Sequence, residues 1–298
     1  MEKDINNIDK SKAKIKKRSQ LKSIVYRYKK NKLAILGAVI FIVLIIISIS
    51  ADLIVDFEKD AVAQNMKERL MTPNEDHIFG TDQYGRDIFA RIIFGSRVSL
   101  FVGLITIAIS LTFGSLIGAT AGYYGGKTDD ILMRIMDIFL AIPSLLLAIS
   151  IVAALGPGMI NLIIELSVSQ VPRFARIVRS SILSIKDQEF IEAAKACGTK
   201  NSRIILKHIL PNAMGPIIVQ ATLNMASTIL NIAALSFIGL GIQPPTPEWG
   251  SMLSDVKTQM RYYPYLAIIP GIAIIIAVMS LNLIGDGLRD ALDPKLKN

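Results

Sequence analysis

The chain has 298 residues, 52% of them hydrophobic, and a mean hydropathy of +0.48. Its apolar residues are gathered into long uncharged runs, which argues against the mixed surface of a soluble protein of this length. The formal net charge is +9. The single cysteine, Cys197, excludes an intramolecular disulfide and any metal site built from several cysteines.

Residues 1–32 form a basic tail. They contain twelve lysines and arginines and only three acidic residues, Glu2, Asp4 and Asp9. A basic segment directly before a hydrophobic span is typical of a cytoplasmic anchor held by anionic membrane lipid. A tail that only orients the first span is the alternative. Nucleic-acid binding is not expected, because no aromatic-rich or folded binding module follows the tail.

Five long apolar runs follow the tail. A hydrocarbon core of about 30 Å requires roughly 20 helical residues, and each run reaches or approaches that length. A sixth segment, 158–178, is interrupted by Glu165 and carries Arg173 and Arg176 near its end. The five plain spans are predicted at residues 33–55, 98–121, 131–155, 213–238 and 264–285.

The placement of charge predicts that the sixth segment also crosses. With the tail in the cytoplasm, the stretch after 158–178 would otherwise lie outside. Residues 173–207 include eight basic and three acidic side chains, an excess typical of cytoplasmic loops, whereas 56–97 has eight acidic and six basic ones. We therefore predict an all-α integral membrane protein with six transmembrane helices and both termini cytoplasmic. A first transmembrane helix with an extracytoplasmic segment occupies 33–97, and a five-helix core occupies 98–298.

The cytoplasmic loop at about 180–212 is predicted to hold two short helices. Asp187 can cap the first helix, and Gly198 supplies its end, where a left-handed backbone costs a glycine little. The second helix begins near residues 199–201. It should stop near Leu210, because Pro211 disfavours helical backbone in the residue before it.

The first of these short helices has the features of a docking element. Ala193 and Ala194 leave small side chains on its face, so that the surface of another protein can approach closely. An amphipathic helix lying on the bilayer is the alternative. Neither short helix, at about 10 residues or roughly 15 Å, could span a membrane.

The string 121–128 differs from a phosphate-binding P-loop at one residue. Ala121 stands where the first glycine of that motif belongs, and a long apolar span precedes the string instead of a strand. We predict a cytoplasmic turn here, with no nucleotide bound. No nucleophile–base or paired-carboxylate arrangement stands out as catalytic. The chain is therefore not expected to be an enzyme or to bind a cofactor.

Polar side chains inside predicted spans are candidates for lining a transport pathway, because their exposure to lipid is costly. The candidates are Glu165, Asn224 and Asn231. Hydrogen bonding between helices is the alternative for each of them. In the outer segment, His77 lies among scattered carboxylates with no recognisable ligand spacing, so no metal site is predicted.

Several strings of residues resemble a known family. Glu192-Ala193-Ala194, Gly198 and Leu210-Pro211 are similar in type and spacing to the EAA loop of ATP-binding-cassette (ABC) importer permeases. Further strings, within about 20–294, resemble the second permease subunit of dipeptide, oligopeptide and nickel importers. They lie at 80–87, 122–126, 207–212, 235–241, 243–250 and 285–290. Val171 and Ile232 depart from that family, which usually has tryptophan and commonly glutamate at these positions.

The resemblance implies an ABC importer type I permease fold in a multi-pass protein of the bacterial inner (plasma) membrane. The EAA loop would form a coupling helix that sits in a cleft of an ATPase subunit. The implied partners are a homologous permease subunit, two ABC ATPase subunits that bind the ATP, and an extracytoplasmic solute-binding protein. The resemblance also places Asp82, Arg86 and Trp249 near the docked binding protein.

The implied cargo is a dipeptide or oligopeptide. A nickel-chelate or glutathione-type importer subunit is the alternative within the same family. A secondary transporter driven by an ion gradient is a more distant alternative, and it should show inverted repeats, which the sequence does not display. An intramembrane enzyme would need a nucleophile or metal pair at matched depth, and we recognise neither.

Overall fold

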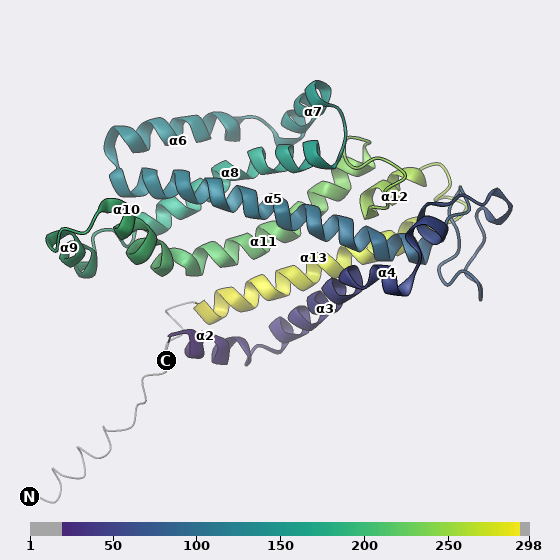
Figure 1. Cartoon of the computed structure of the whole chain (residues 1–298), viewed down its shortest axis with the longest axis horizontal. Coiled ribbons are helices and arrows are strands. Elements are labelled where there is room, and N and C mark those ends of the chain that lie inside the picture. The colour runs from purple at the N-terminus through teal and green to yellow at the C-terminus, as the bar shows by residue number, and fades with distance from the viewer. Residues whose placement is uncertain (1–19, 293–298) are drawn as a thin grey trace, which may run out of the picture.

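The computed structural model describes residues 20–292, so most of the predicted basic tail lies outside the described residues. Within this part the fold is helical, with one isolated bridge between Thr81 and Asp87. The longer helices (Figure 1) are α2 (Gln20–Tyr28), α3 (Lys32–Ile49), α5 (Ile88–Tyr124), α6 (Gly126–Ala141), α7 (Ser144–Leu155), α8 (Met159–Leu183), α9 (Glu189–Ala196), α11 (Leu210–Phe237) and α13 (Tyr265–Leu292). The short ones are α4 (Ala51–Ile54), η1 (Phe57–Val62), η2 (Met66–Glu68), α10 (Asn201–Arg203), η3 (Ile204–Ile209) and α12 (Trp249–Asp255).

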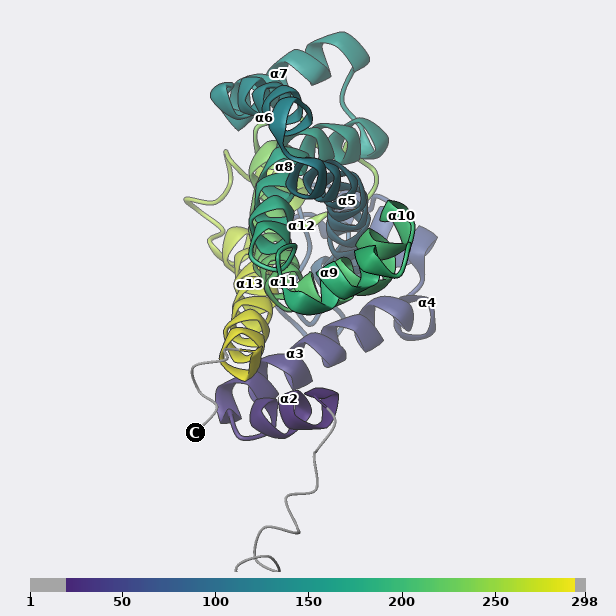
Figure 2. The ribbon, with the colours of Figure 1, turned by 90° about the vertical axis from the view of Figure 1, so that its left-hand side faces the viewer.

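The described helices confirm the all-α class. By length and composition, four of them can cross a membrane: α3, α5, α13 and the continuous helical path Asn201–Phe237 that ends in α11. The pair α6 and α7 gives a fifth if it is counted as one bent span. Helix α8 packs along α5 (Figures 1 and 2), but its charged side chains keep it outside this group. The count of six spans therefore stays a prediction.

The predicted span at 131–155 is not continuous. The chain bends by 86° between α6 and α7. Ile142, with φ −85° and ψ 123°, leaves the helical region directly before Pro143. The proline ring disfavours helical backbone in the preceding residue, which explains the position of the break.

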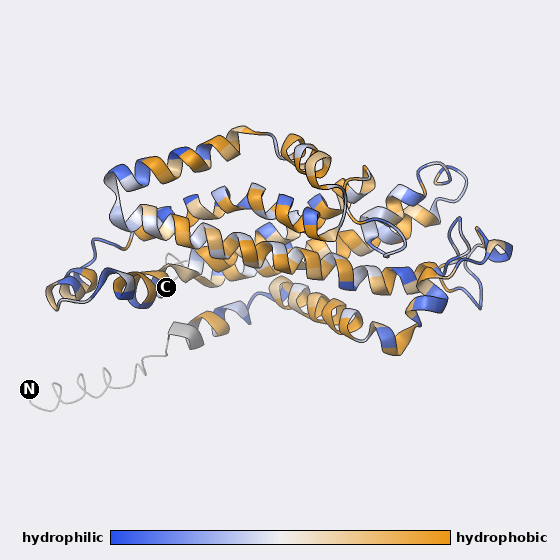
Figure 3. Ribbon diagram, turned by 45° about the horizontal axis from the view of Figure 1, so that its top comes forward, coloured by the Kyte–Doolittle hydropathy of each residue, from blue (hydrophilic) through white to orange (hydrophobic). Residues whose placement is uncertain are grey.

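The bundle has two polar ends with an apolar middle (Figure 3). Helices α9 and α10 lie at one end, which we call the α9 end. The loop from η1 to residue 87 and helix α12 lie at the other, the α12 end (Figure 1). Helix α2 and the last turn of α13 both lie at the α9 end. This arrangement requires the chain to cross the bundle an even number of times between α2 and the end of α13. That the α9 end faces the cytoplasm remains a prediction.

Three glycines on α5 allow it to contact α8 backbone to backbone. Gly114, Gly118 and Gly122 recur every four residues and so lie on one helix face. A Cβ added at Gly118 would lie 2.3 Å from the carbonyl oxygen of Ala175, and one at Gly114 would lie 2.4 Å from Cβ of Phe174. Close approach through small residues is a common way for membrane helices to associate. This stripe was not among the features predicted from the sequence, although its four-residue spacing is visible there.

Gly118→Ala should destabilise the chain by about 1–3 kcal/mol, because the added methyl group overlaps a backbone oxygen that has little room to move. The measurement is the midpoint of thermal unfolding of the detergent-purified protein. Gly271→Ala in α13 is the matched control, since a Cβ there meets nothing within 4 Å. Equal midpoints for the two variants would contradict close α5–α8 packing.

Candidate functional site

Helix α9 is the predicted docking helix. It begins at Glu189, and Gln188 is the extended residue before it, with φ −80° and ψ 148°. The predicted cap at Asp187 is wrong: this residue belongs to the turn that continues from α8, one position too early, and α9 has no side-chain cap. Glu189 and Glu192 instead place negative charge in the first turn, where it complements the helix dipole.

The end of α9 is a Schellman motif. Gly198 has φ +75°, as predicted for the left-handed position. Its N–H donates to the carbonyl of Lys195 at 2.9 Å, and the N–H of Thr199 donates to the carbonyl of Ala194 at 3.1 Å. A Cβ at Gly198 would meet nothing within 4 Å, so the backbone angle, and not lack of space, is what favours glycine there.

Helix α9 has one buried and one exposed face. Ile191 is fully buried in a cluster with Ile204 and Ile209, and Ala194 lies half-buried against that cluster. On the opposite face Ala193 and Phe190 are exposed. The small surface available to a partner is therefore centred on Ala193, and Ala194 contributes mainly to packing within the chain.

The second short helix does not stop at Leu210. Helix α10 passes into the π-helical segment η3 and then directly into α11, so that Asn201–Phe237 forms one helical path. Pro211 falls in the first turn of α11, directly after the π-helical segment η3. The predicted end at Leu210 was wrong because the chain stays helical on both sides of this proline.

The loop between α8 and α11 is joined to the rest of the α9 end. The buried cluster around Ile191 includes Val178 and Ile182 of α8 and Ile217 of α11. The hydroxyl of Tyr123, at the end of α5, donates to the Asn201 side-chain oxygen at 2.8 Å. A force applied to α9 would therefore reach three long helices.

The string that resembles a P-loop forms the turn between α5 and α6, as predicted. Residues 121–124 belong to α5. Gly125 and Gly126 then take positive φ angles of 64° and 52° and begin α6. The strand that precedes a P-loop is replaced here by a helix.

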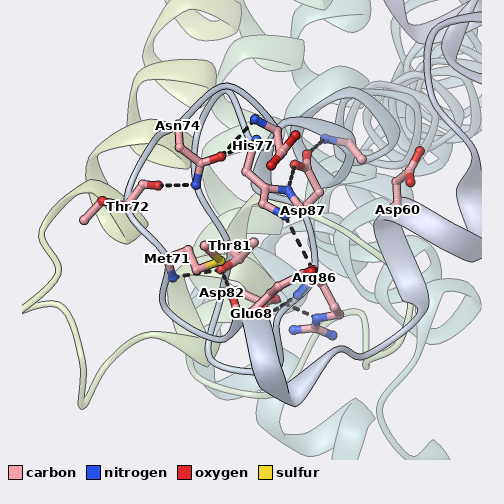
Figure 4. A network of polar contacts seen from close by, with 12 residues as sticks. Asp60, Glu68, Met71, Thr72, Asn74, His77, Thr81, Asp82, Arg86 and Asp87 are labelled. Carbon is pink, nitrogen blue, oxygen red and sulfur yellow. Dashed lines mark hydrogen bonds and ion pairs between the residues drawn. The ribbon is translucent and has the colours of Figure 1, made fainter.

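At the α12 end, three buried charged residues, Asp82, Arg86 and Arg91, form a cluster with the partly buried Asp255 (the charge cluster; Figure 4 labels Asp82 and Arg86). Arg86 donates from Nε to Asp82 at 2.6 Å and from Nη2 to Asp255 at 2.9 Å. Arg91 lies 3.6 Å from Asp82 and 3.8 Å from Asp255. The cluster ties the loop before α5 to α12.

Trp249 is also internal. Only 1% of it is exposed, and its indole N–H donates to the carbonyl of Ile92 at 3.1 Å. The neighbouring Glu248 caps α12 by accepting from the N–H groups of Gly250 and Ser251, both at 2.8 Å. Burial raises the pKa of the Glu248 carboxyl, and these two hydrogen bonds act in the opposite direction.

The burial of Asp82, Arg86 and Trp249 corrects one expectation. Their exposed fractions are 5%, 2% and 1%, so these side chains do not present a surface to a partner. They hold the outer loops in place, and direct contact with a binding protein would have to come from exposed neighbours. Docking of this segment as a whole stays a prediction.

His77 contributes a second link at the same end (Figure 4). Its Nδ1 lies 2.7 Å from the carboxylate of Asp87, which also caps α5 by accepting from the N–H of Ala90 at 2.8 Å. Within residues 20–292, no three histidine, cysteine or carboxylate side chains are grouped as metal ligands.

The three predicted pathway residues lie in different surroundings. Glu165 is 1% exposed and its Oε2 has no hydrogen-bond partner. Asn224 is 9% exposed and accepts from Nε2 of Gln220 at 3.0 Å. Asn231 is exposed on α11. Of the three, only Asn231 lies where a pathway on the outside of this chain could reach it.

Two family profiles match the chain. Residues 114–298 match the binding-protein-dependent transport system inner membrane component, and residues 19–73 match the N-terminal transmembrane domain of oligopeptide transport permease C. Among solved structures, an inward-facing MetNI methionine ABC transporter chain superposes with a TM-score of 0.58 at 20% identity. The match covers 69% of this chain and 98% of that one. This likeness supports the type I permease fold.

Curated relatives agree over almost the whole chain. The dipeptide transport system permease protein DppC of Alkalihalophilus pseudofirmus is 51% identical, covering 91% of this chain and 88% of the relative. The oligopeptide transport system permease protein OppC of Bacillus subtilis is 41% identical, covering 93% and 90%. The glutathione transport system permease protein GsiD of Escherichia coli is 42% identical, covering 91% and 89%. This chain therefore belongs to the family of binding-protein-dependent transport system inner membrane components.

Proposed function

We propose that the chain is one permease subunit of a bacterial ABC importer that carries dipeptides or oligopeptides. The observation that carries this proposal is the exposed Ala193 face of α9, on a loop that continues without a break into α11. The names of the dipeptide and oligopeptide relatives support the peptide cargo. The partners are a homologous permease subunit, two ABC ATPase subunits and an extracytoplasmic solute-binding protein.

In this mechanism α9 occupies a cleft of an ATPase subunit at the α9 end. Closure of the ATPases on ATP displaces α9. Because Ile191 packs with Ile204 and Ile209, the displacement passes through η3 to α11. The long helices then expose the pathway toward the binding protein at the α12 end. All ATP chemistry takes place on the partner subunits.

Glutathione is the second candidate cargo, because the relative named for glutathione transport is 42% identical over 273 residues. Glutathione is itself a modified tripeptide, so both cargoes present amide groups and free carboxylates. The two proposals share the coupling mechanism and differ only in the molecule that the binding protein supplies.

The test is uptake by cells from which this chain has been deleted. We expect loss of ATP-dependent uptake of radiolabelled alanylalanine and its recovery when the intact chain is supplied. Unchanged alanylalanine uptake together with loss of glutathione uptake would select the second cargo. Uptake that persists without any ATPase partner would contradict both proposals and favour an ion-driven transporter.

A further inference from the structure

A groove with a mainly apolar lining and several serine and asparagine side chains lies between α8 and α11 at the α9 end. Its volume is about 780 Å³, within the range of small-molecule sites. Ser180 and Ser184 line it from the α8 side, and Asn212 and Pro216 line it from α11. Leu292 of α13 contributes to its wall. These two serines, Asn212 and Pro216 are exposed, whereas Ala213, which also lines the groove, is buried, so the groove is open at its mouth.

Polar side chains continue beyond the groove along both helices. On α8, Arg173 and Arg176 are exposed on the same side as Ser180. On α11, Ser227 and Asn231 are exposed farther along the helix from Asn212. Exposed polar side chains on membrane-embedded helices are costly against lipid. These faces are therefore expected to border water or another protein.

Arg173 is the unpaired member of three arginines on α8. Arg176 forms an ion pair with Asp137 at 2.6 Å, and Arg179 forms one with Asp129 at 2.5 Å. Within the described residues, Arg173 makes no hydrogen bond or ion pair. Arg173 lies one helical turn before Ile177, on the face of α8 that lines the groove, and one turn beyond the lining itself.

We propose that this groove binds the peptide on its way to the cytoplasm and that Arg173 pairs with the C-terminal carboxylate of the peptide. This inference rests on the proposed function. An arginine can donate two parallel N–H groups to one carboxylate. The positive charge of Arg173 would be balanced when the carboxylate of a peptide binds there. The serine hydroxyls and the Asn212 amide can serve the peptide backbone, and the apolar wall can contact its side chains.

The test uses the assembled importer in which Cys197 is replaced by serine and Ser180→Cys supplies a thiol in the groove. We expect a charged, water-soluble thiol reagent to label this cysteine in the absence of ATP. Alanylalanine should slow labelling several-fold, and its C-terminal amide should slow it much less. Arg173→Gln should remove the difference between the two peptides, while Arg173→Lys should keep part of it.

Arg134→Gln is the matched control, because Arg134 is an exposed arginine on α6 that is not among the residues lining the groove. It should keep the protection by alanylalanine. Normal uptake with no labelling, or with labelling that neither peptide slows, would overturn the groove as a peptide site and favour a protein partner there. Equal protection by the dipeptide and its amide would overturn the role of Arg173. Absence of uptake by the unaltered importer would instead contradict the proposed function.

Discussion

Replacing Ala193 with tryptophan should reduce ATP-dependent uptake by at least about tenfold while the chain remains inserted in the membrane. Ala193 lies on the exposed face of α9, opposite the buried Ile191. An indole ring at this position does not disturb the chain's own core, but it prevents close approach of a partner surface. The measurements are uptake of alanylalanine and stimulation of ATPase activity in the purified complex.

Ala154→Trp on α7 is the control for this variant. Ala154 is also an exposed alanine, but it lies far from α9 along the chain, near the end of α7. It should support normal uptake. Tryptophan at Ala194 would be a poorer test, because Ala194 packs against the cluster around Ile191 and its replacement would alter folding as well as docking. Normal coupling in Ala193→Trp would exclude α9 as the ATPase contact.

The sequence predicted features that depend on local chemistry. The apolar runs located α3, α5 and α13, because a long uncharged helix is identifiable from composition alone. Gly198 was identified because the residue that ends a helix in a left-handed conformation is usually glycine. Both inferences require only residues close together in the chain.

The effect of each proline could not be predicted locally. Pro172, Pro216 and Pro270 lie inside α8, α11 and α13, which continue through them. Pro143 instead coincides with the 86° bend. Neighbouring helices and local adjustments can satisfy backbone groups that a proline frees, and this packing is not visible in the sequence. The predicted span at 131–155 is for this reason bent and not one continuous helix.

The outer site was also beyond local reasoning. Asp82, Arg86 and Trp249 were expected near a docked binding protein because of the family resemblance. Arg86 is buried because it pairs with Asp255, which lies 169 positions along the chain. Such a pairing is a property of the tertiary fold, and nothing in either segment alone indicates it.

Replacing Asp82 with asparagine should cost about 3–5 kcal/mol of stability, because it leaves two buried arginines with a single carboxylate. The amide oxygen of asparagine can still accept the N–H groups of Tyr84 and Arg86, which lie 2.8 and 3.1 Å from Oδ1 of Asp82. The loss would therefore come from the missing charge. The midpoint of thermal unfolding of the detergent-purified protein measures it, and Asp76→Asn, at an exposed carboxylate in the same segment, is the control.

A second substitution separates charge balance from shape. Adding Arg91→Met to Asp82→Asn removes one positive charge with the negative one, leaving Arg86 paired with Asp255 at 2.9 Å. Arg91→Met removes a buried Nη2 that has no hydrogen-bond partner, and it also removes the hydrogen bond that Nη1 donates to the carbonyl of Ala61 at 3.0 Å. The double variant should recover part of the stability lost in Asp82→Asn. If the double variant is less stable than Asp82→Asn by the full cost of Arg91→Met alone, Asp82 and Arg91 do not interact, which would contradict the expected recovery.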